Sequence, residues 1–207
     1  MWQIFLGSIT LSIIHALIPN HWLPLVAIGR SEQWSQRETL SATIVVAYAH
    51  IASTVIIGIT VGFIGYKLSD AFTVISKIFA PLVLVILGAI YIILDIKSPE
   101  HHNHTHYKVN RSNRSRLAIL TSLSLAMFLS PCIELEAYYF QAGTQGWPGI
   151  LTVSAVYSII TPALMVLLVF LGYKGLNKFN WDFFEHHIRK ITGITLIMLG
   201  ILAFFIK

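Results

Sequence analysis

The sequence is poor in charged residues and contains a single cysteine. Charged residues make up 11% of the 207-residue chain, whereas about 25% is usual in soluble domains. Hydrophobic residues make up 56%, and this balance excludes an ordinary soluble fold. The lone thiol, Cys132, excludes an internal disulfide and a relay between two thiols of one chain. No Gly-x-x-x-x-Gly-Lys-Ser/Thr pattern occurs, so the sequence offers no phosphate loop for ATP.

Long apolar runs occur six times along the chain. They cover residues 2–19, 40–66, 72–94, 117–141, 150–173 and 188–206. Each run is long enough to cross roughly 30 Å of hydrocarbon as a helix. The first has no basic residue before it and no small-residue cleavage site, which is typical of a retained span rather than a signal peptide. We therefore predict an all-α integral membrane protein with six transmembrane helices in contact with the lipid bilayer.

Basic residues concentrate in three of the connections between the predicted spans. Eleven of the fourteen Lys and Arg residues lie in the first–second, third–fourth and fifth–sixth connections. The positive-inside rule places these connections in the cytoplasm and both termini outside. The predicted location is the cytoplasmic (inner) membrane, crossed several times. The net charge of +5 reports this orientation and not a nucleic-acid partner.

The two halves of the sequence look related. A gap-free shift of 112 positions pairs Pro19 with Pro131, Phe72 with Phe184, Lys77 with Arg189, and Leu87-Gly88 with Leu199-Gly200. Since each half has three predicted spans, the second must enter the membrane in the opposite sense, which gives a 3+3 inverted repeat typical of transporters. We predict a first three-helix repeat over 1–96, a His-rich cytoplasmic loop over 97–115 and a second three-helix repeat over 116–207.

Polar residues of metal-ligand types gather within the predicted spans. The first span ends in His15, Asn20 and His21, the second holds His50, and the fourth holds Cys132 and Glu134. Ionisable groups in hydrocarbon cost about 2.5–3.5 kcal/mol each on insertion scales, so those that persist usually face a cavity or a partner. The set therefore predicts a metal site near the middle of the membrane.

Two prolines adjoin these polar residues. Pro19 cannot donate to the carbonyl of His15, and Pro131 cannot donate to that of Met127, so both helices are expected to break there. Broken helices bare backbone groups, as at the midplane ion sites of transporters. The alternative is that the polar side chains only hydrogen-bond across helices, each contributing roughly 0.6–2 kcal/mol. Three histidines, a thiol and a carboxylate beside two helix breaks favour the ion site.

Helical geometry separates the two carboxylates of the fourth span. Glu134 lies about one turn from Pro131 and on the face of Tyr138, while Glu136 points about 160° away from it. Glu134 is therefore the predicted member of the metal site. Glu136 is expected to face the outer water instead.

Four histidines lie within six residues of the predicted cytoplasmic loop. They are His101, His102, His104 and His106. Imidazole binds zinc, nickel, copper and cobalt ions, so we predict that this loop captures cytoplasmic metal. The alternative is a solvated polar linker.

A glycine series in the second span suits close helix packing. Gly58, Gly62 and Gly65 are four and three residues apart, a spacing that lets backbones approach in membranes. The sequence leaves open whether this face packs within the bundle or between copies in a homo-oligomer.

The segment His-Ala-Leu-Ile-Pro-Asn-His at residues 15–21 resembles the first-helix signature His-Ala-Leu-x-Pro-Asp-His of the nickel/cobalt exporter family. That family belongs to the lysine-exporter-like superfamily of membrane transporters. His50 ahead of Ser53, Pro131-Cys132 in the fourth span and the His-rich loop extend the resemblance. It covers the six-span layout of the whole chain.

The resemblance implies an efflux carrier for divalent transition-metal ions in the cytoplasmic membrane. The ligands that it implies are His15, His21 and His50. Asn20 stands where the family usually has aspartate, and Ile133 stands where a second proline often occurs. The first departure removes a negative charge, which Glu134 could restore from the other half.

These observations predict a membrane transporter that exports divalent transition-metal ions such as nickel, cobalt or zinc. The ion is the substrate, and no tightly bound cofactor is expected. Histidine and glutamate can titrate near neutrality, so protons would compete with the metal and proton exchange could drive transport.

Two alternatives stay open at this point. One is an intramembrane zinc-dependent hydrolase, in which the histidines of the first two spans hold zinc and Glu134 activates a water. The other is a membrane protein that delivers metal to an enzyme or assists its assembly.

Overall fold

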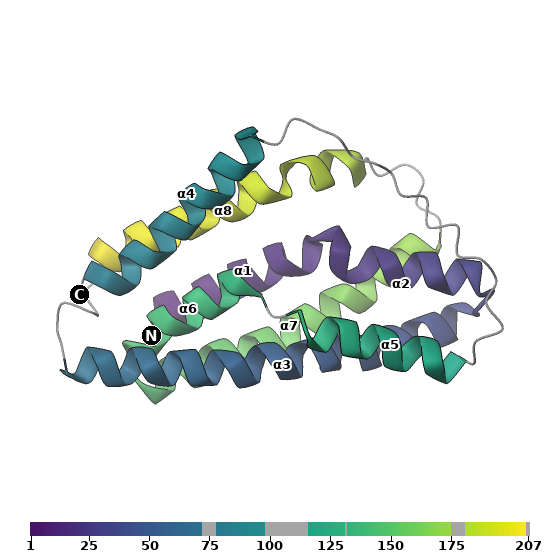
Figure 1. Ribbon diagram of the computed structural model, residues 1–207, viewed down its shortest axis with the longest axis horizontal. Coiled ribbons are helices and arrows are strands. Elements are labelled where there is room, and N and C mark those ends of the chain that lie inside the picture. The colour runs from purple at the N-terminus through teal and green to yellow at the C-terminus, as the bar shows by residue number, and fades with distance from the viewer. Residues whose placement is uncertain (72–77, 98–115, 131, 175–180, 206–207) are drawn as a thin grey trace.

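The computed structural model is a helical bundle in which α1 begins and α8 ends at the same end (Figure 1). It describes residues 1–71, 78–97, 116–130, 132–174 and 181–205. The helices are α1 (Trp2–Leu17), α2 (Pro19–Ser31), α3 (Gln36–Ala71), α4 (Ala80–Lys97), α5 (Arg116–Phe128), α6 (Ile133–Gly143), α7 (Trp147–Tyr173) and α8 (Trp181–Phe205). The predicted capture histidines, His101, His102, His104 and His106, lie outside the described residues.

Several helices are long and apolar enough to cross a membrane. Within the described residues these are Trp2–Ser31 (α1 with α2), Gln36–Ser69 of α3, and α7. The pair α5 and α6 adds a fourth candidate if the two helices form one span. Shorter apolar stretches, Ala80–Ile90 and Lys190–Phe204, lie in α4 and α8. The chain is thus a helical membrane protein with three to four candidate spans among the described residues. The predicted all-α membrane fold is confirmed, and its six-span layout stays a prediction.

Two helix breaks interrupt the bundle where they were expected. Ile18, between α1 and α2, has an extended backbone with φ −61° and ψ 120°, as is favoured before a proline. Pro19 has no N–H for the carbonyl of His15, which accepts from the N–H of Ile18 at 3.1 Å instead. Cys132, between α5 and α6, is extended with φ −98° and ψ 105°, and these helices meet at 49°. Both predicted breaks are confirmed.

The two broken helix pairs pack reciprocally. α1 and α2 lie against α7, while α5 and α6 lie against α3. α3 and α7 also contact each other, and α4 pairs with α8 along one side of the bundle (Figure 1). The breaks of both pairs therefore meet in the middle of the molecule, beside α3 and α7.

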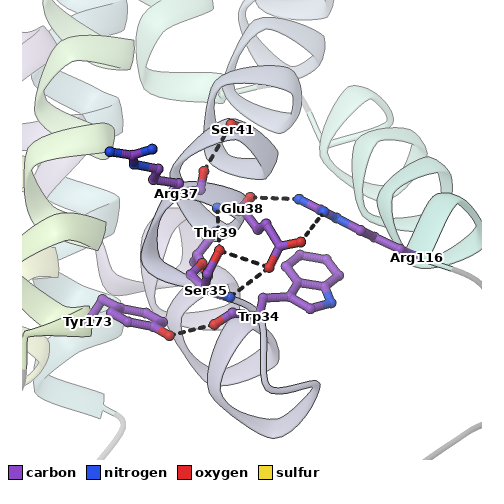
Figure 2. Close-up of polar contacts among 8 residues, drawn as sticks. All are labelled: Trp34, Ser35, Arg37, Glu38, Thr39, Ser41, Arg116 and Tyr173. Carbon is purple, nitrogen blue, oxygen red and sulfur yellow. Dashed lines mark hydrogen bonds and ion pairs between the residues drawn. The ribbon is translucent and has the colours of Figure 1, made fainter.

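One end of the bundle is tied together around the turn between α2 and α3 (Figure 2). Ser35 and Glu38 form a capping box at the start of α3: the Ser35 N–H donates to the Glu38 carboxylate at 2.7 Å, and the Glu38 N–H donates to the Ser35 hydroxyl at 3.3 Å. Arg116 at the start of α5 donates to the same carboxylate at 2.7 Å. The Tyr173 hydroxyl at the end of α7 donates to the carbonyl of Trp34. These contacts fix the ends of α3, α5 and α7 relative to one another.

Glycines bring α3 and α6 into backbone contact. A Cβ added to Gly143 would lie 2.0 Å from the carbonyl oxygen of Gly62, and one added to Gly58 would lie 2.3 Å from the ring of Tyr139. A Cβ on Gly65 would lie 2.5 Å from the carbonyl oxygen of residue 140. The glycine face of α3 therefore packs within the bundle, which decides between the two alternatives that the sequence left open.

Gly143→Ala is expected to destabilise the protein, because the new methyl group must push α6 away from the backbone of α3. Overpacking of this kind costs about 1–3 kcal/mol, so the thermal unfolding midpoint in detergent should fall. Leu151→Ala is the control, since Leu151 is 58% exposed on α7. An unchanged midpoint for Gly143→Ala would mean that α3 and α6 are not in contact at this position.

Candidate metal centre

Four metal-ligand side chains meet where the helix breaks face α3. They are His15 at the end of α1, His21 in α2, His50 in α3 and Cys132 at the start of α6. One ligand atom from each lies within 4.8 Å of the other three. His15, His50 and Cys132 are buried and His21 is half-buried. The structure thus brings together four of the six residues that the sequence predicted for the site.

The spacing of the donor atoms suits a four-coordinate metal ion. The Cys132 sulfur lies 3.3 Å from Nε2 of His15 and 3.2 Å from Nε2 of His50, and these two nitrogens are 3.4 Å apart. Bonds of about 2.0 Å from zinc to nitrogen and about 2.3 Å to sulfur give tetrahedral edges of about 3.3 Å (N to N) and about 3.5 Å (N to S). The Cys132 sulfur and the Nε2 atoms of His15 and His50 therefore fit an ion of this size where they stand. With His21 included, the ligand atoms span up to 4.8 Å, so the His21 side chain would move closer to complete four-fold coordination.

His21 closes the group from the start of α2. Its ring centre lies 4.4 Å from that of His15 and 4.9 Å from that of His50. Nδ1 of His21 is buried and has no hydrogen-bond partner among the described residues. Pro19 begins α2 two residues before His21 and, because it interrupts the helical hydrogen bonding, separates this helix from α1.

A backbone carbonyl sets the orientation of His50. Nδ1 of His50 lies 3.0 Å from the carbonyl oxygen of Met127. Since a carbonyl can only accept, Nδ1 carries the hydrogen and Nε2 presents its lone pair to the cluster. The sequence predicts that this carbonyl lacks a helical partner, because residue 131 is a proline, but it does not predict which side chain uses it. The carbonyl beside the second helix break, that of Met127, therefore orients His50, which belongs to the first half of the chain.

The two carboxylates of α6 differ in their surroundings. Oε1 of Glu134 lies 3.9 Å from Nδ1 of His15, on the side of the ring opposite the cluster. Glu134 is therefore beside the four donors and not among them. Both carboxylate oxygens of Glu136 are buried and have no hydrogen-bond partner among the described residues, so the expectation that Glu136 faces the outer water is wrong.

The last predicted member of the site is Asn20, and Tyr157 is a further residue that lies close to the cluster. Asn20 belongs to α2, but its side chain lies outside the described residues. Tyr157 of α7 is fully buried, and its ring centre lies 5.7 Å from that of His15. This aromatic ring thus lies beside the cluster on the side of α7.

Comparison with protein-family models, with curated proteins and with solved structures gives no match to this chain. The fold and the site nevertheless define a class of protein. The chain is a helical membrane protein with several apolar spans and a buried His/Cys group that could hold a metal ion. The resemblance of residues 15–21 to the nickel/cobalt exporter signature stays a prediction, carried by the motif alone.

Proposed function

We propose that this protein is a membrane transporter that exports divalent transition-metal ions in exchange for protons. The observation that carries the proposal is the buried group of three imidazoles and a thiol at two facing helix breaks. Imidazole and thiolate together suit borderline and soft ions such as zinc and cobalt, and disfavour magnesium, calcium and manganese. Ion sites built at broken helices in the membrane interior are characteristic of transporters.

The donor count favours a carried ion over a catalytic one. Catalytic zinc sites have three protein ligands and keep the fourth position for water or substrate. Here four donors converge, and the thiol and two of the imidazoles are buried. An ion bound to all four donors would have no position for the water that the hydrolase alternative requires.

The packing of the helices supports the proposed 3+3 inverted repeat. α1 and α2 contact α7 in the same way that α5 and α6 contact α3, and α4 pairs with its counterpart α8. A two-fold exchange of the halves 1–96 and 116–207 would reproduce these contacts, but not those of α1 with α8 and of α4 with α6. On this proposal α4 and α8 are the third and sixth spans, the loop over 97–115 delivers cytoplasmic metal, and both termini lie outside.

The test is metal flux into proteoliposomes loaded with a metal-sensitive dye, with the internal pH recorded at the same time. Zinc, cobalt, nickel, cadmium and manganese are compared. We expect flux of the first four and none of manganese, with a coupled pH change, because the donors are nitrogen and sulfur. His15→Ala should reduce flux to the level of protein-free vesicles.

Ile13→Ala is the matched control, since Ile13 is 39% exposed on the same helix and should retain flux. If no ion moves although metal binds stoichiometrically, transport is wrong and metal delivery or hydrolysis takes its place. Flux without a pH change would contradict the proposed proton exchange but not the proposed metal transport.

A further inference from the structure

Glu134 and the Met127 carbonyl occupy equivalent places behind two of the histidines. The Nε2 atoms of His15 and His50 face the Cys132 sulfur at 3.3 and 3.2 Å. The opposite nitrogen of His50 meets the Met127 carbonyl, and the opposite nitrogen of His15 faces the Glu134 carboxylate at 3.9 Å. Oxygen partners at this second nitrogen orient ligand histidines and raise their basicity.

The partner of His15 differs from that of His50 because the Glu134 carboxylate can carry a negative charge, whereas the Met127 carbonyl is neutral. Nδ1 of His15 is buried and has no hydrogen-bond partner among the described residues, and the Glu134 carboxylate faces it at 3.9 Å. Glu134 itself is buried. A buried carboxylate is stabilised by a nearby positive charge, and the cluster beside Glu134 is where a cation would bind.

Counted over the four donors and Glu134, the charges balance for a divalent ion. A divalent ion bound to the Cys132 thiolate and three neutral imidazoles leaves one positive charge, which the Glu134 carboxylate cancels. A monovalent soft ion in the same donor set would leave one negative charge. Uncompensated charge is unfavourable in a buried site for either sign.

Given the metal site of the proposed function, we propose that Glu134 is a positioning and specificity-determining residue, which holds His15 through Nδ1 and makes the cluster selective for divalent over monovalent soft ions. It does not bind the ion. It orients one ligand and supplies the compensating charge from the second half of the chain.

The experiment measures the affinities of the purified full chain for Zn²⁺ and for Ag⁺, a monovalent ion that also binds thiolate and imidazole. Glu134→Gln keeps the size and a polar group facing His15 but removes the charge. We expect Zn²⁺ affinity to fall by about 10- to 100-fold, as is typical when a partner of a ligand histidine is changed. Ag⁺ affinity should stay the same or rise, so the ratio of the two affinities falls.

Glu136→Gln is the matched control, because it removes a second buried carboxylate of α6 that makes no ion pair or hydrogen bond with the four donors in the described part of the chain. It should retain the wild-type ratio. Equal losses for both ions in Glu134→Gln, or an equal change of ratio in Glu136→Gln, would overturn the inference and leave the metal site standing. If the wild-type protein does not bind Zn²⁺ at all, this result would instead contradict the proposed function itself.

Discussion

His50→Ala is expected to lower the affinity for Zn²⁺ by on the order of 10²- to 10³-fold. Four-ligand zinc sites bind with about 10–16 kcal/mol, so one ligand of four accounts for about 2.5–4 kcal/mol, and each 1.4 kcal/mol is about tenfold. Nε2 of His50 lies at the centre of the donor group, 3.2 Å from the sulfur and 3.4 Å from Nε2 of His15. Isothermal titration calorimetry on the purified protein measures the effect.

Two further variants separate loss of a ligand from loss of the fold. His50→Asn retains an N–H that can reach the Met127 carbonyl but has no atom at the position of Nε2, so it should keep the unfolding midpoint and still lose the metal. Tyr48→Ala removes an aromatic side chain that is 54% exposed on the same helix, and should bind normally. Normal Zn²⁺ binding by His50→Ala and His50→Asn would show that the cluster is not the metal site.

Bound metal is expected to protect the single thiol of the chain from alkylation. Cys132 is the only cysteine of the sequence and is buried. Maleimides react with a free thiolate, so coordination of the sulfur should slow the reaction by on the order of tenfold or more. Mass spectrometry of the intact protein follows the reaction without interference from another thiol.

The protection must depend on the histidines if the four side chains act as one site. Addition of EDTA should restore the rate of the metal-free protein, and His50→Ala should react at one rate with and without Zn²⁺. Equal rates for the wild-type protein in both conditions would mean that the sulfur does not bind the ion. His21 could then still contribute to a site of nitrogen donors alone.

The parts of the site that were predictable from the sequence follow from local rules. A proline removes an N–H and disfavours helix at the preceding residue, so the breaks beside His15 and Cys132 could be placed without a structure. The high cost of polar groups in hydrocarbon also predicted that the histidines and the thiol would converge. These inferences need no knowledge of how the helices pack.

The other features of the site depend on how each helix is rotated about its axis and on which helices pack together. Local sequence rules do not determine either of these. Helical geometry predicted that Glu134 and Glu136 point in different directions. It did not predict which of these directions faces the first half, because the rotation of α6 about its axis depends on its close contacts with the glycines of α3. The partner of the Met127 carbonyl lies 77 residues away in the sequence. The number of spans stays a prediction, because the apolar stretches described in α4 and α8 are short, Ala80–Ile90 and Lys190–Phe204.

The four donors are divided unequally between the two parts of the chain. His15, His21 and His50 come from residues 1–96, and only Cys132 comes from residues 116–207. An ion bound to all four would be a cross-link between the two parts, with a single metal–sulfur bond on one side. Any motion that separates them lowers the coordination number from four to three, and a three-nitrogen site admits water. On the proposed transport function, the transported ion would therefore also hold the two parts of the chain together, and the metal–sulfur bond would be the one that breaks when they separate.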